Sequence, residues 1–367
     1  MLTYEFPPIG GGLANTCYYL LKEFANTSTL EIDLVTSSPD NTFRIRKFSN
    51  NLRIFELSVN KKDLHFWRMS EVMKWTWEAY RFSNKLINRY DYDLCHCWSG
   101  WPAGIIGYAR RKKVPYIISL RGSDVPGYNV RLKILDRIIL NFVSMIVWKN
   151  AKAITANSRK LRELAEKTYN RKSIQVIYNG VDAIKFRPIT NRDGFNVLFV
   201  GRLIKRKGVI YLLKAINEVF GEYNNLKLTI VGEGPQMKHL ENFCNQEKID
   251  TKVEFLGAVE HENIATIYQR ADILVLPSFE ESLANVALEA MASGLPIITT
   301  NTGTAELLDG NGFIVERKND KQIREDIIRY MRNRELLKRH GRKSRKIAEK
   351  MSWDNTAQAY MHIYNFR

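Results

Sequence analysis

Short apolar runs rich in β-branched and aromatic residues alternate along this chain with stretches of helical periodicity. This alternation is typical of α/β layers in which helices cover a parallel sheet. Strands are predicted at Leu30–Ser37, Leu52–Val59, Leu94–Trp98, Tyr116–Leu120, Ala153–Ala156, Ile174–Ile177, Asn196–Val200, Lys227–Val231, Val253–Leu256, Ile273–Leu276 and Pro296–Thr300. Helices are predicted at Ala14–Phe24, Phe66–Asn88, Val130–Val147, Val209–Phe220, Gln236–Glu247, Ile264–Arg270 and Asn285–Ser293.

The order of these elements fits two successive doubly wound sheets. A chain of 367 residues is long enough for two domains of roughly 100–200 residues each. We place the join near Phe186-Arg187-Pro188, so that the first domain covers residues 1–187 and the second begins at residue 188.

The net charge of +17 is concentrated in the first half of the chain. Residues 1–187 contain 30 Lys and Arg against 16 Asp and Glu, whereas residues 188–367 contain 26 against 23. An acidic partner is therefore expected to meet the first half, and nucleic acid, anionic lipid and a phosphorylated acceptor all remain open. A basic surface that serves only solubility is the alternative.

Other features indicate a soluble cytosolic protein. No apolar run reaches the ~18 residues of a membrane-spanning helix, the start of the chain lacks a signal-peptide pattern, and four cysteines are too few for a disulfide framework. Two stretches nevertheless suit a membrane interface: Ile138–Trp148, which has no charged residue, and Phe66–Tyr80, which mixes Trp with Arg and Lys. Core helices are the alternative, and no nucleic-acid-binding signature accompanies these residues.

The most specific motif follows the predicted strand Ile273–Leu276. It begins with Pro277-Ser278 and passes through Glu281 into a predicted helix that carries Glu289. A helix N-terminus after a strand presents free N–H groups and the helix dipole to an anion. A carboxylate just inside it suits hydrogen bonds to the vicinal hydroxyls of a sugar. Two glutamates on a solvent-exposed helix face are the ordinary alternative.

A second motif, Val200–Gly208, follows another predicted strand. Arg202 and Lys207 leave the carboxyl end of that strand, where open α/β sheets bind their ligands, and two such cations can neutralise a pyrophosphate. The segment Gly232–Pro235 forms a third tight turn after the next strand. A solvated basic loop is the alternative.

Together these motifs resemble those of retaining nucleotide-sugar glycosyltransferases of family 4. The resemblance covers nearly the whole chain and includes Glu5-Phe6-Pro7-Pro8 before Gly10-Gly11-Gly12, Asn179-Gly180-Val181-Asp182 with Phe186 and Pro188, and Ser352-Trp353-Asp354. It implies the GT-B fold, an α/β architecture of two Rossmann-like doubly wound domains facing a central cleft. Residues 1–187 would bind the acceptor, residues 188–350 would bind the nucleotide sugar, and a closing helix in residues 351–367 would cross back to the first domain.

The resemblance also implies roles for individual residues. Arg202 and Lys207 would hold the donor diphosphate, and Glu281 would contact the donor sugar and stabilise the reacting centre; these three are the predicted catalytic residues. Glu289 would bind the ribose hydroxyls. The other predicted donor-binding positions are two glycines whose backbone would approach the phosphates, a glycine turn, a residue near the base and the start of the helix: Gly11, Gly12, Gly232, Glu260, Ser282, Leu283, Ala284 and Asn285.

The expected chemistry agrees with these roles. Sugar transfer passes through an oxocarbenium-like centre while negative charge grows on the departing diphosphate. Two fixed cations stabilise that charge more in the transition state than in the ground state, so we expect neither a metal ion nor another cofactor. Retention in this family is usually ascribed to attack beside the leaving phosphate, and we name no nucleophile.

One segment departs from the family pattern. After the predicted strand Tyr116–Leu120 the family often has a histidine, whereas this chain has Arg121. Arg121 could contact the donor phosphate or an acidic acceptor, and Asp124 could contact an acceptor hydroxyl. His96 resembles a family histidine near the acceptor site, although a buried imidazole with satisfied hydrogen bonds is the alternative. His96, Arg121 and Asp124 are thus the predicted acceptor-binding residues.

The sequence therefore predicts a metal-independent glycosyltransferase that moves a sugar from a UDP- or GDP-sugar to a glycan or lipid-linked acceptor. Biosynthesis of surface polysaccharide, lipopolysaccharide or glycolipid is the expected setting. We expect the protein in the cytoplasm, either free or peripheral on the inner face of the cytoplasmic membrane, with no nucleic-acid partner. A sugar-nucleotide epimerase of similar architecture and a basic nucleic-acid-binding protein are the alternatives.

Overall fold

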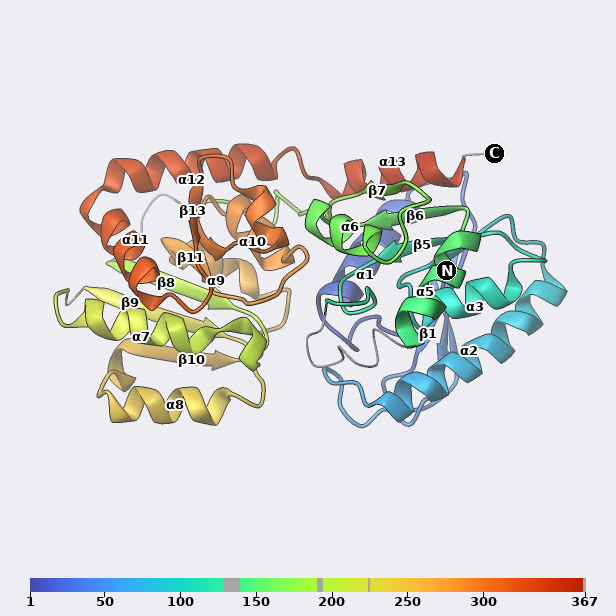
Figure 1. Cartoon of the computed structure of the whole chain (residues 1–367), viewed down its shortest axis with the longest axis horizontal. Helices are drawn as coiled ribbons and strands as arrows, with labels where there is room; N and C mark the ends of the chain where they lie inside the picture. The colour runs from blue at the N-terminus through green and yellow to red at the C-terminus, as the bar shows by residue number, and fades with distance from the viewer. Residues whose placement is uncertain (129–138, 190–193, 224, 366–367) are drawn as a thin grey trace. The chain divides into compact units, whose positions relative to one another are not determined.

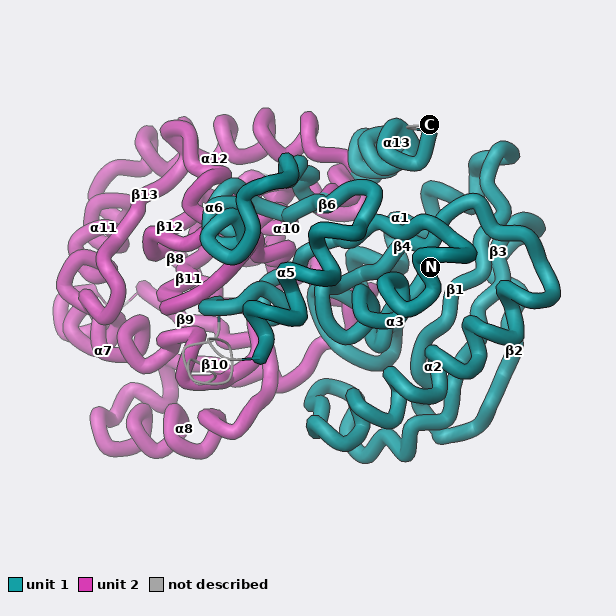
Figure 2. Tube along the Cα trace, turned by 45° about the vertical axis from the view of Figure 1, so that its right-hand side comes forward, with its two compact units in different colours: residues 1–179, 353–367 teal, residues 180–352 magenta. Residues whose placement is uncertain are grey.

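The chain forms two compact units (Figures 1 and 2). The computed structural model describes residues 1–128, 139–189, 194–223 and 225–365. Unit 1 contains Met1–Asn179 and Trp353–Arg367, and unit 2 contains Gly180–Ser352. The boundary therefore lies between residues 179 and 180, whereas the sequence places it between residues 187 and 188.

Residues 180–188 belong to unit 2 because of the bonds that they make. The Val181 N–H donates to the carbonyl oxygen of Met351 (2.8 Å). The Arg345 guanidinium donates to the carbonyl oxygens of Ala183 and Phe186 (2.9 and 2.7 Å), and the Phe186 side chain is buried. Long-range contacts that a local pattern does not contain thus decide where unit 2 begins.

Unit 1 is built on a mainly parallel sheet whose centre is the N-terminal segment. Its described strands are β1 (Ile32–Ser37), β2 (Arg44–Ser49), β3 (Leu52–Leu57), β4 (Cys95–Cys97), β5 (Tyr116–Leu120), β6 (Ala153–Ala156) and β7 (Ile174–Val176). They form the groups β2-β3-β1 and β4-β5-β6-β7, in which β2 runs antiparallel to β3. Leu2 pairs with Val35 of β1 and with Cys97 of β4, and so joins the two groups.

The sequence does not predict β2 or the central segment around Leu2. In β2, Arg44, Arg46 and Lys47 are all exposed, since this strand lies at the edge of the sheet, so no apolar run marks it. The segment around Leu2 is too short to show any periodicity.

Helices pack against the unit 1 sheet. The described ones are α1 (Gly12–Ala25), α2 (Met69–Arg89), α3 (Ala103–Arg110), α5 (Asn141–Asn150), α6 (Arg159–Glu166) and α13 (Trp353–Tyr364). The last of these packs on α1, where the Tyr19 and Trp353 rings stack with centroids 5.4 Å apart. For the predicted helix Val130–Val147, residues 130–138 lie outside the described residues and residues 141–147 lie in α5.

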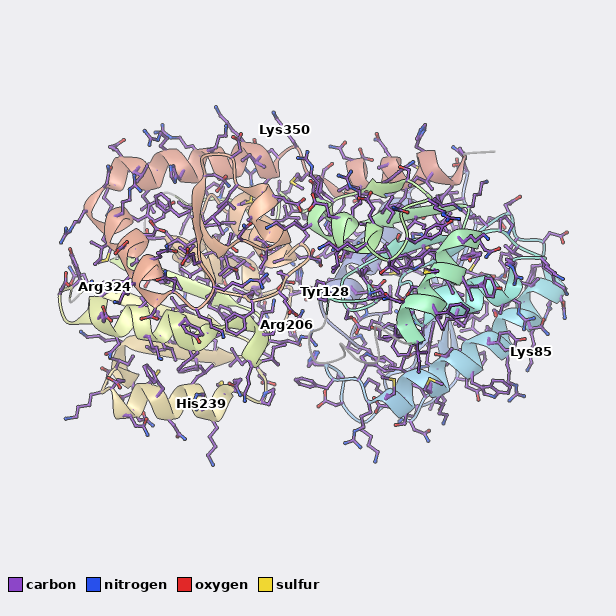
Figure 3. The ribbon with its side chains drawn as sticks, in the orientation of Figure 1. Lys85, Tyr128, Arg206, His239, Arg324 and Lys350 are labelled. Carbon is purple, nitrogen blue, oxygen red and sulfur yellow. The ribbon has the colours of Figure 1, made fainter. Side chains whose placement is uncertain are left out.

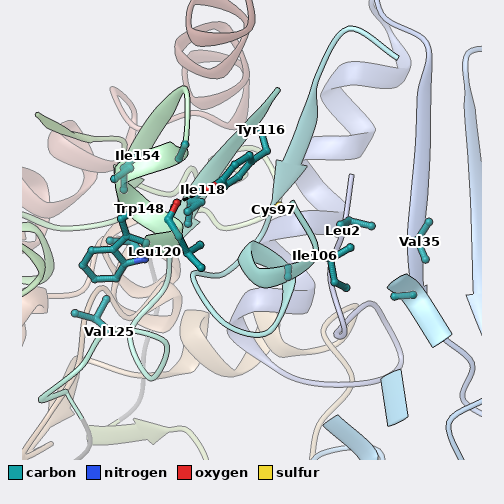
Figure 4. Packing of buried hydrophobic residues seen from close by; sticks show 14 of the residues in the cluster. Leu2, Val35, Cys97, Ile106, Tyr116, Ile118, Leu120, Val125, Trp148 and Ile154 are labelled. Atoms are coloured by element: carbon teal, nitrogen blue, oxygen red, sulfur yellow. Dashed lines mark hydrogen bonds between the residues drawn. The ribbon is translucent and has the colours of Figure 1, made fainter. Parts of the chain in front are cut away.

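The core of unit 1 includes two clusters of buried hydrophobic residues. Figure 4 shows part of it, in which Tyr116 and Ile118 of β5 belong to one buried cluster with Trp148 of α5 and Ile154 of β6. The Tyr116 hydroxyl donates to the carbonyl oxygen of Val147. Burial of these side chains fixes β5, and therefore the position of the loop that follows it.

Unit 2 has a fully parallel sheet with the strand order β10-β9-β8-β11-β12-β13. Its strands are β8 (Phe195–Val200), β9 (Leu226–Val231), β10 (Val253–Gly257), β11 (Ile273–Leu276), β12 (Ile297–Thr300) and β13 (Gly312–Val315). Its helices are α7 (Val209–Phe220), α8 (Met237–Gln246), α9 (Ile264–Arg270), α10 (Asn285–Ala292), α11 (Asp320–Arg332) and α12 (Arg334–Ala348), with short 3₁₀ turns at η3 (Lys205–Lys207), η4 (Asp250–Lys252) and η5 (Gly303–Leu307).

The strand order in unit 2 reverses direction between β8 and β11. Successive strands run outward from β8 through β9 to β10, and then outward from β11 through β12 to β13 on the other side. This is the doubly wound order, in which ligands bind beyond the carboxyl ends of the strands at the point of reversal. The loops after β8 and β11 are those that contain the two predicted motifs.

Candidate active site

The loops that follow β8 and β11 are joined by backbone contacts. The Phe279 N–H donates to the carbonyl oxygen of Arg206 (2.8 Å), a residue labelled in Figure 3. Gly208 has φ +67°, and a Cβ atom at this position would lie 2.2 Å from the carbonyl oxygen of Pro277. The close approach requires glycine, and it holds the two motifs in one place.

Lys207 and Glu281 form an ion pair between these two loops. The Lys207 Nζ donates to the Glu281 Oε2, and the two side chains are 11% and 15% exposed. Burial opposes ionisation of Glu281, but the charges of Lys207, Arg206 and Arg202 outweigh it and hold the pKa of this carboxyl below its usual value. Glu281 is therefore an anion, and an ammonium with three donors retains capacity for a second acceptor.

Arg202 lies at the rim of the same cluster. Its side chain is exposed, whereas the neighbouring Leu203 is fully buried and anchors the loop. Its charge contributes to lowering the pKa of Glu281, so the guanidinium lies within electrostatic range of the ion pair. The arrangement brings three cationic side chains and one carboxylate to the carboxyl ends of the central strands.

Packing within unit 2 requires a glycine at position 232, and the sequence alone does not reveal this requirement. Its φ is +126°, and a Cβ atom there would lie 2.1 Å from the carbonyl oxygen of Gly201. Its N–H donates to the carbonyl oxygen of Gly257 (2.7 Å). Gly232 thus packs the turn after β9 against the turn after β8, and a contact with the donor stays a prediction.

Glu289 lies one turn inside α10 and is 8% exposed. Its Oε1 is 3.0 Å from His261 Nε2, and its Oε2 accepts from the Tyr268 hydroxyl at 2.7 Å. Burial, and then the neighbouring Glu289 carboxylate, holds the pKa of Tyr268 well above its usual range. Tyr268 therefore stays protonated and donates to Glu289.

His261 is a site residue that the sequence analysis missed. It directly follows Glu260, which was predicted to lie near the base. The Glu260 side chain is exposed, and the Glu260 carbonyl oxygen accepts from the Asn263 N–H (3.0 Å). His261 and Glu289 are 28 residues apart in the chain. A histidine beside a predicted binding residue was the available signal, but no local pattern links it to Glu289.

The start of α10 has no side-chain cap and no acidic residue in its first turn. Ser282, Leu283 and Ala284 are buried before it, and the Ala284 N–H donates to Thr304 Oγ1 (3.2 Å). Asn285 is the first helical residue. An uncapped N-terminus without a carboxylate suits an anionic ligand, although the Ala284 N–H is already bonded to Thr304.

In unit 1, the predicted glycines lie at the start of α1. The helix begins at Gly12 with Gly11 as its N-cap, and it has neither a side-chain cap nor an acidic first turn. A Cβ atom at Gly11 would meet no other atom of the described structure within 4 Å. Packing within unit 1 therefore does not require a glycine here, which is compatible with close approach of a ligand.

The predicted acceptor residues lie in a buried polar network of unit 1. His96 is 2% exposed, with Nδ1 2.8 Å from the Tyr364 hydroxyl and Nε2 2.7 Å from Ser119 Oγ. Burial, and then the charge of Arg121, holds the pKa of His96 well below its usual range. These contacts favour the buried-imidazole alternative for His96.

Arg121 and Asp124 also have partners inside unit 1. Arg121 donates to Asn179 Oδ1 and to the Tyr360 hydroxyl, both at 2.9 Å. Asp124 accepts from the N–H groups of Gly100, Arg121 and Gly122, and burial raises its pKa although these donors oppose the shift. Asp124 thus stabilises the loop after β5 by these hydrogen bonds. Contacts of Arg121 and Asp124 with an acceptor stay predictions.

Within the ranges that the structure describes, no group of three or more His, Cys, Asp or Glu side chains could hold a metal ion. Most of the charged side chains in the cluster at the carboxyl ends of β8 and β11 are cations, which suits an anionic ligand.

Comparisons with known proteins agree with this geometry. The family model "Glycosyltransferase Family 4" matches residues 10–184, and the model "Glycosyl transferases group 1" matches residues 181–347. An uncharacterized glycosyltransferase of Methanocaldococcus jannaschii is 29% identical, with 99% of this chain and 97% of the relative covered. The alpha-monoglucosyldiacylglycerol synthase of Acholeplasma laidlawii is 24% identical, with 86% and 84% covered.

A solved structure shows the same architecture. The Anabaena protein Alr3699/HepE, crystallised with UDP and glucose, has a TM-score of 0.78 to this chain at 16% identity, and the alignment covers 100% of this chain and 98% of that one. The two matched models together span both units. This chain is a glycosyltransferase of the family 4 type with the two-domain Rossmann-like GT-B fold.

Proposed function

We propose that this enzyme transfers a sugar from a nucleoside-diphosphate sugar, with retention at the anomeric carbon, to a glycan or lipid-linked acceptor. The observation that carries the proposal is the pairing of Lys207 with Glu281 beside Arg202, at the point where the strand order of unit 2 reverses. Glu289, one turn inside α10, supplies a carboxylate for a ribose. The Anabaena neighbour, crystallised with UDP and glucose, supports a UDP-sugar, and a GDP-sugar is equally compatible with these residues.

In this mechanism the cations act on the leaving group. Arg202 and Lys207 bind the diphosphate and stabilise the negative charge that grows as the glycosidic bond breaks. Glu281, held as an anion by the surrounding cations, orients Lys207 and stabilises the positive charge at the anomeric carbon. Charge on both sides of the breaking bond is thus balanced by side chains, and the proposed reaction needs neither a metal ion nor another cofactor.

The acceptor is proposed to be anionic or to lie at an anionic membrane surface. The supporting feature is one exposed stripe that winds slowly around α2, since four residues are slightly more than one helical turn. It has a residue every four positions: Met69, Met73, Trp77, Arg81 and Lys85. The first three are 55%, 56% and 60% exposed, and Lys85 is labelled on this helix in Figure 3. An apolar half followed by a basic half fits a helix that lies in an anionic interface.

Among the described residues, no helix is both long and apolar enough to cross a membrane. The Acholeplasma relative is named for a glycolipid product. This name supports the proposal that the enzyme acts in surface polysaccharide, lipopolysaccharide or glycolipid synthesis, either free in the cytoplasm or peripheral on the inner face of the cytoplasmic membrane.

Calorimetric titration with UDP, GDP, ADP and CDP, in buffer with EDTA, tests the donor site. Binding of one nucleotide identifies the base and supports a metal-independent site. If none of them binds to folded protein, and Mg²⁺ or Mn²⁺ restores binding, the metal-independent part of the proposal is wrong. If none binds under either condition, the whole donor proposal is wrong.

A further inference from the structure

Lys185, His261 and Glu289 form a chain of hydrogen bonds within unit 2. The Lys185 Nζ is 3.0 Å from His261 Nδ1 and donates to the carbonyl oxygen of His261 at 2.6 Å. On the other side of the imidazole, Nε2 is 3.0 Å from Glu289 Oε1. The chain runs from the segment that opens unit 2, through the loop after β10, to the first turns of α10.

The direction of these bonds assigns the proton on the ring. An ammonium has three donors and no acceptor, so the ring nitrogen that faces it can only accept. Nδ1 therefore carries no proton, the hydrogen is on Nε2, and that N–H points at Glu289. Lys185 thereby selects the histidine tautomer that can donate to the carboxylate.

Packing holds each member of the chain in place. The Lys185 N–H donates to Asp182 Oδ1 (2.9 Å). The Phe186 ring lies edge-on to both His261 and Tyr268, with centroids 5.6 Å apart in each case. One buried aromatic side chain therefore packs against both His261 and Tyr268.

Glu289 then receives one fixed donor on each oxygen. His261 donates to Oε1, and Tyr268 donates to Oε2 at 2.7 Å. A carboxylate has about four lone-pair positions, so one position on each oxygen is still available to a vicinal diol. The two donors prevent the carboxylate from rotating and so hold the remaining positions in a fixed plane.

We propose that Lys185 and His261 are positioning residues for the nucleotide ribose and act through Glu289. This inference rests on the proposed function, in which Glu289 binds the two ribose hydroxyls. It adds that recognition of those hydroxyls depends on a tautomer that Lys185 selects. Loss of His261 removes one of the two donors that hold Glu289, and loss of Lys185 removes the contact that selects the donating tautomer. Either change weakens the bonds of Glu289 to the diol.

The test compares a nucleotide that has the diol with one that lacks it. Affinities of UDP and 2′,3′-dideoxy-UDP are measured by calorimetry for the wild type, His261→Leu, His261→Gln and Lys185→Met, with the GDP pair in their place if GDP is the preferred nucleotide. A glutamine retains an N–H donor, so His261→Gln is the conservative variant. His239→Leu, on the exposed face of α8 (Figure 3), is the matched control.

For His261→Leu and Lys185→Met we expect UDP to bind about three- to tenfold more weakly, as for the loss of one hydrogen bond. The dideoxy nucleotide should bind as it does to the wild type. His261→Gln should recover most of the lost affinity, and His239→Leu should change neither ligand. In turnover, the donor KM should rise while kcat is retained.

Four outcomes would contradict the inference or its basis. If the substitutions weaken the binding of both nucleotides equally, they disturb the site as a whole. If the affinity for UDP is unchanged, the chain of hydrogen bonds has no role in binding. Either result overturns the inference. A wild type that binds UDP and dideoxy-UDP equally would overturn the ribose role of Glu289. A wild type that binds no nucleotide overturns the proposed function itself.

Discussion

Gly208 packs directly on Pro277, so that the backbone at the end of η3 touches the backbone that leaves β11. A Cβ atom on Gly208 would lie 2.2 Å from the Pro277 carbonyl oxygen, and φ there is +67°. The contact joins the loop of Lys207 to the loop of Glu281. The ion pair between those two side chains therefore depends on a position at which only glycine fits.

Gly208→Ala should destabilise unit 2 by at least about 2 kcal/mol, because the left-handed conformation alone costs roughly 1–2 kcal/mol and the Cβ also displaces the Pro277 carbonyl. Gly221→Ala is the matched control, since Gly221 has φ −66° and its Cβ would have its nearest neighbour at 3.6 Å. That control should be neutral or stabilise by about 0.4–1 kcal/mol.

The readout must distinguish the two units. All seven tryptophans lie in unit 1, so tryptophan fluorescence follows unit 1, and hydrogen exchange of β8 and β11 follows unit 2. Faster exchange in unit 2 with an unchanged fluorescence transition is the expected result for Gly208→Ala. Wild-type exchange rates in β8 and β11 would contradict the packing argument.

Lys207→Ala should weaken binding of the preferred nucleoside diphosphate by about ten- to a hundredfold, as for a charged hydrogen bond, and should also reduce turnover. Arg202→Ala should act in the same direction. Lys205→Ala, at an exposed position of the same turn, is the control and should change little. Calorimetry and steady-state kinetics measure both quantities; unchanged binding in Lys207→Ala would remove this residue from the phosphate site.

Glu281→Gln should reduce turnover more than it reduces nucleotide affinity. The amide keeps the size of the side chain but supplies no negative charge to the anomeric centre. Single-turnover kinetics with the natural donor, beside calorimetry with the nucleoside diphosphate, separate the two effects. A variant with wild-type turnover would exclude Glu281 from the reacting centre.

Stability should depend on pH through Glu281. Its pKa is lower in the folded chain because nearby cations outweigh burial, so its contribution is present above the unfolded-state pKa of about 4.3 and is lost as pH falls through the folded-state value. The difference in unfolding free energy between wild type and Glu281→Gln should therefore shrink below about pH 4.3. Hydrogen exchange of β8 and β11 across this range measures it, and a difference that grows toward acid would reverse the assigned sign.

The exposed stripe of α2 should bind anionic vesicles. Arg81→Gln and Lys85→Gln should each weaken co-sedimentation at low salt by about fivefold, since one basic residue near an anionic surface contributes about 1 kcal/mol. Trp77→Ser should weaken it at low and high salt alike, because burial of an aromatic ring is not screened. Lys238→Gln, exposed on α8 in unit 2, is the control. Equal binding by all variants would mean that another surface, or none, meets the membrane.

Local patterns were sufficient for the elements whose own residues determine them. The strand Ile273–Leu276 and the helix from Asn285 lie where they were predicted, because an apolar run and a run of helix-favouring residues are properties of neighbouring residues. The same holds for Val209–Phe220 after the Lys207 motif. The order of these elements was enough to predict two doubly wound sheets, and the motifs between them were enough to predict the family.

Tertiary structure decided what depends on residues far apart in the chain. The segment around Leu2 becomes the centre of the unit 1 sheet because it pairs with β1 and β4. Unit 2 begins at residue 180, since Arg345 binds the carbonyl oxygens that follow. Lys185 meets His261 across 76 residues, and His261 meets Glu289 across 28. The sequence by itself thus determined which elements form and which side chains leave the strand ends; folding alone determined their partners, because hydrogen bonds and burial depend on distance in space.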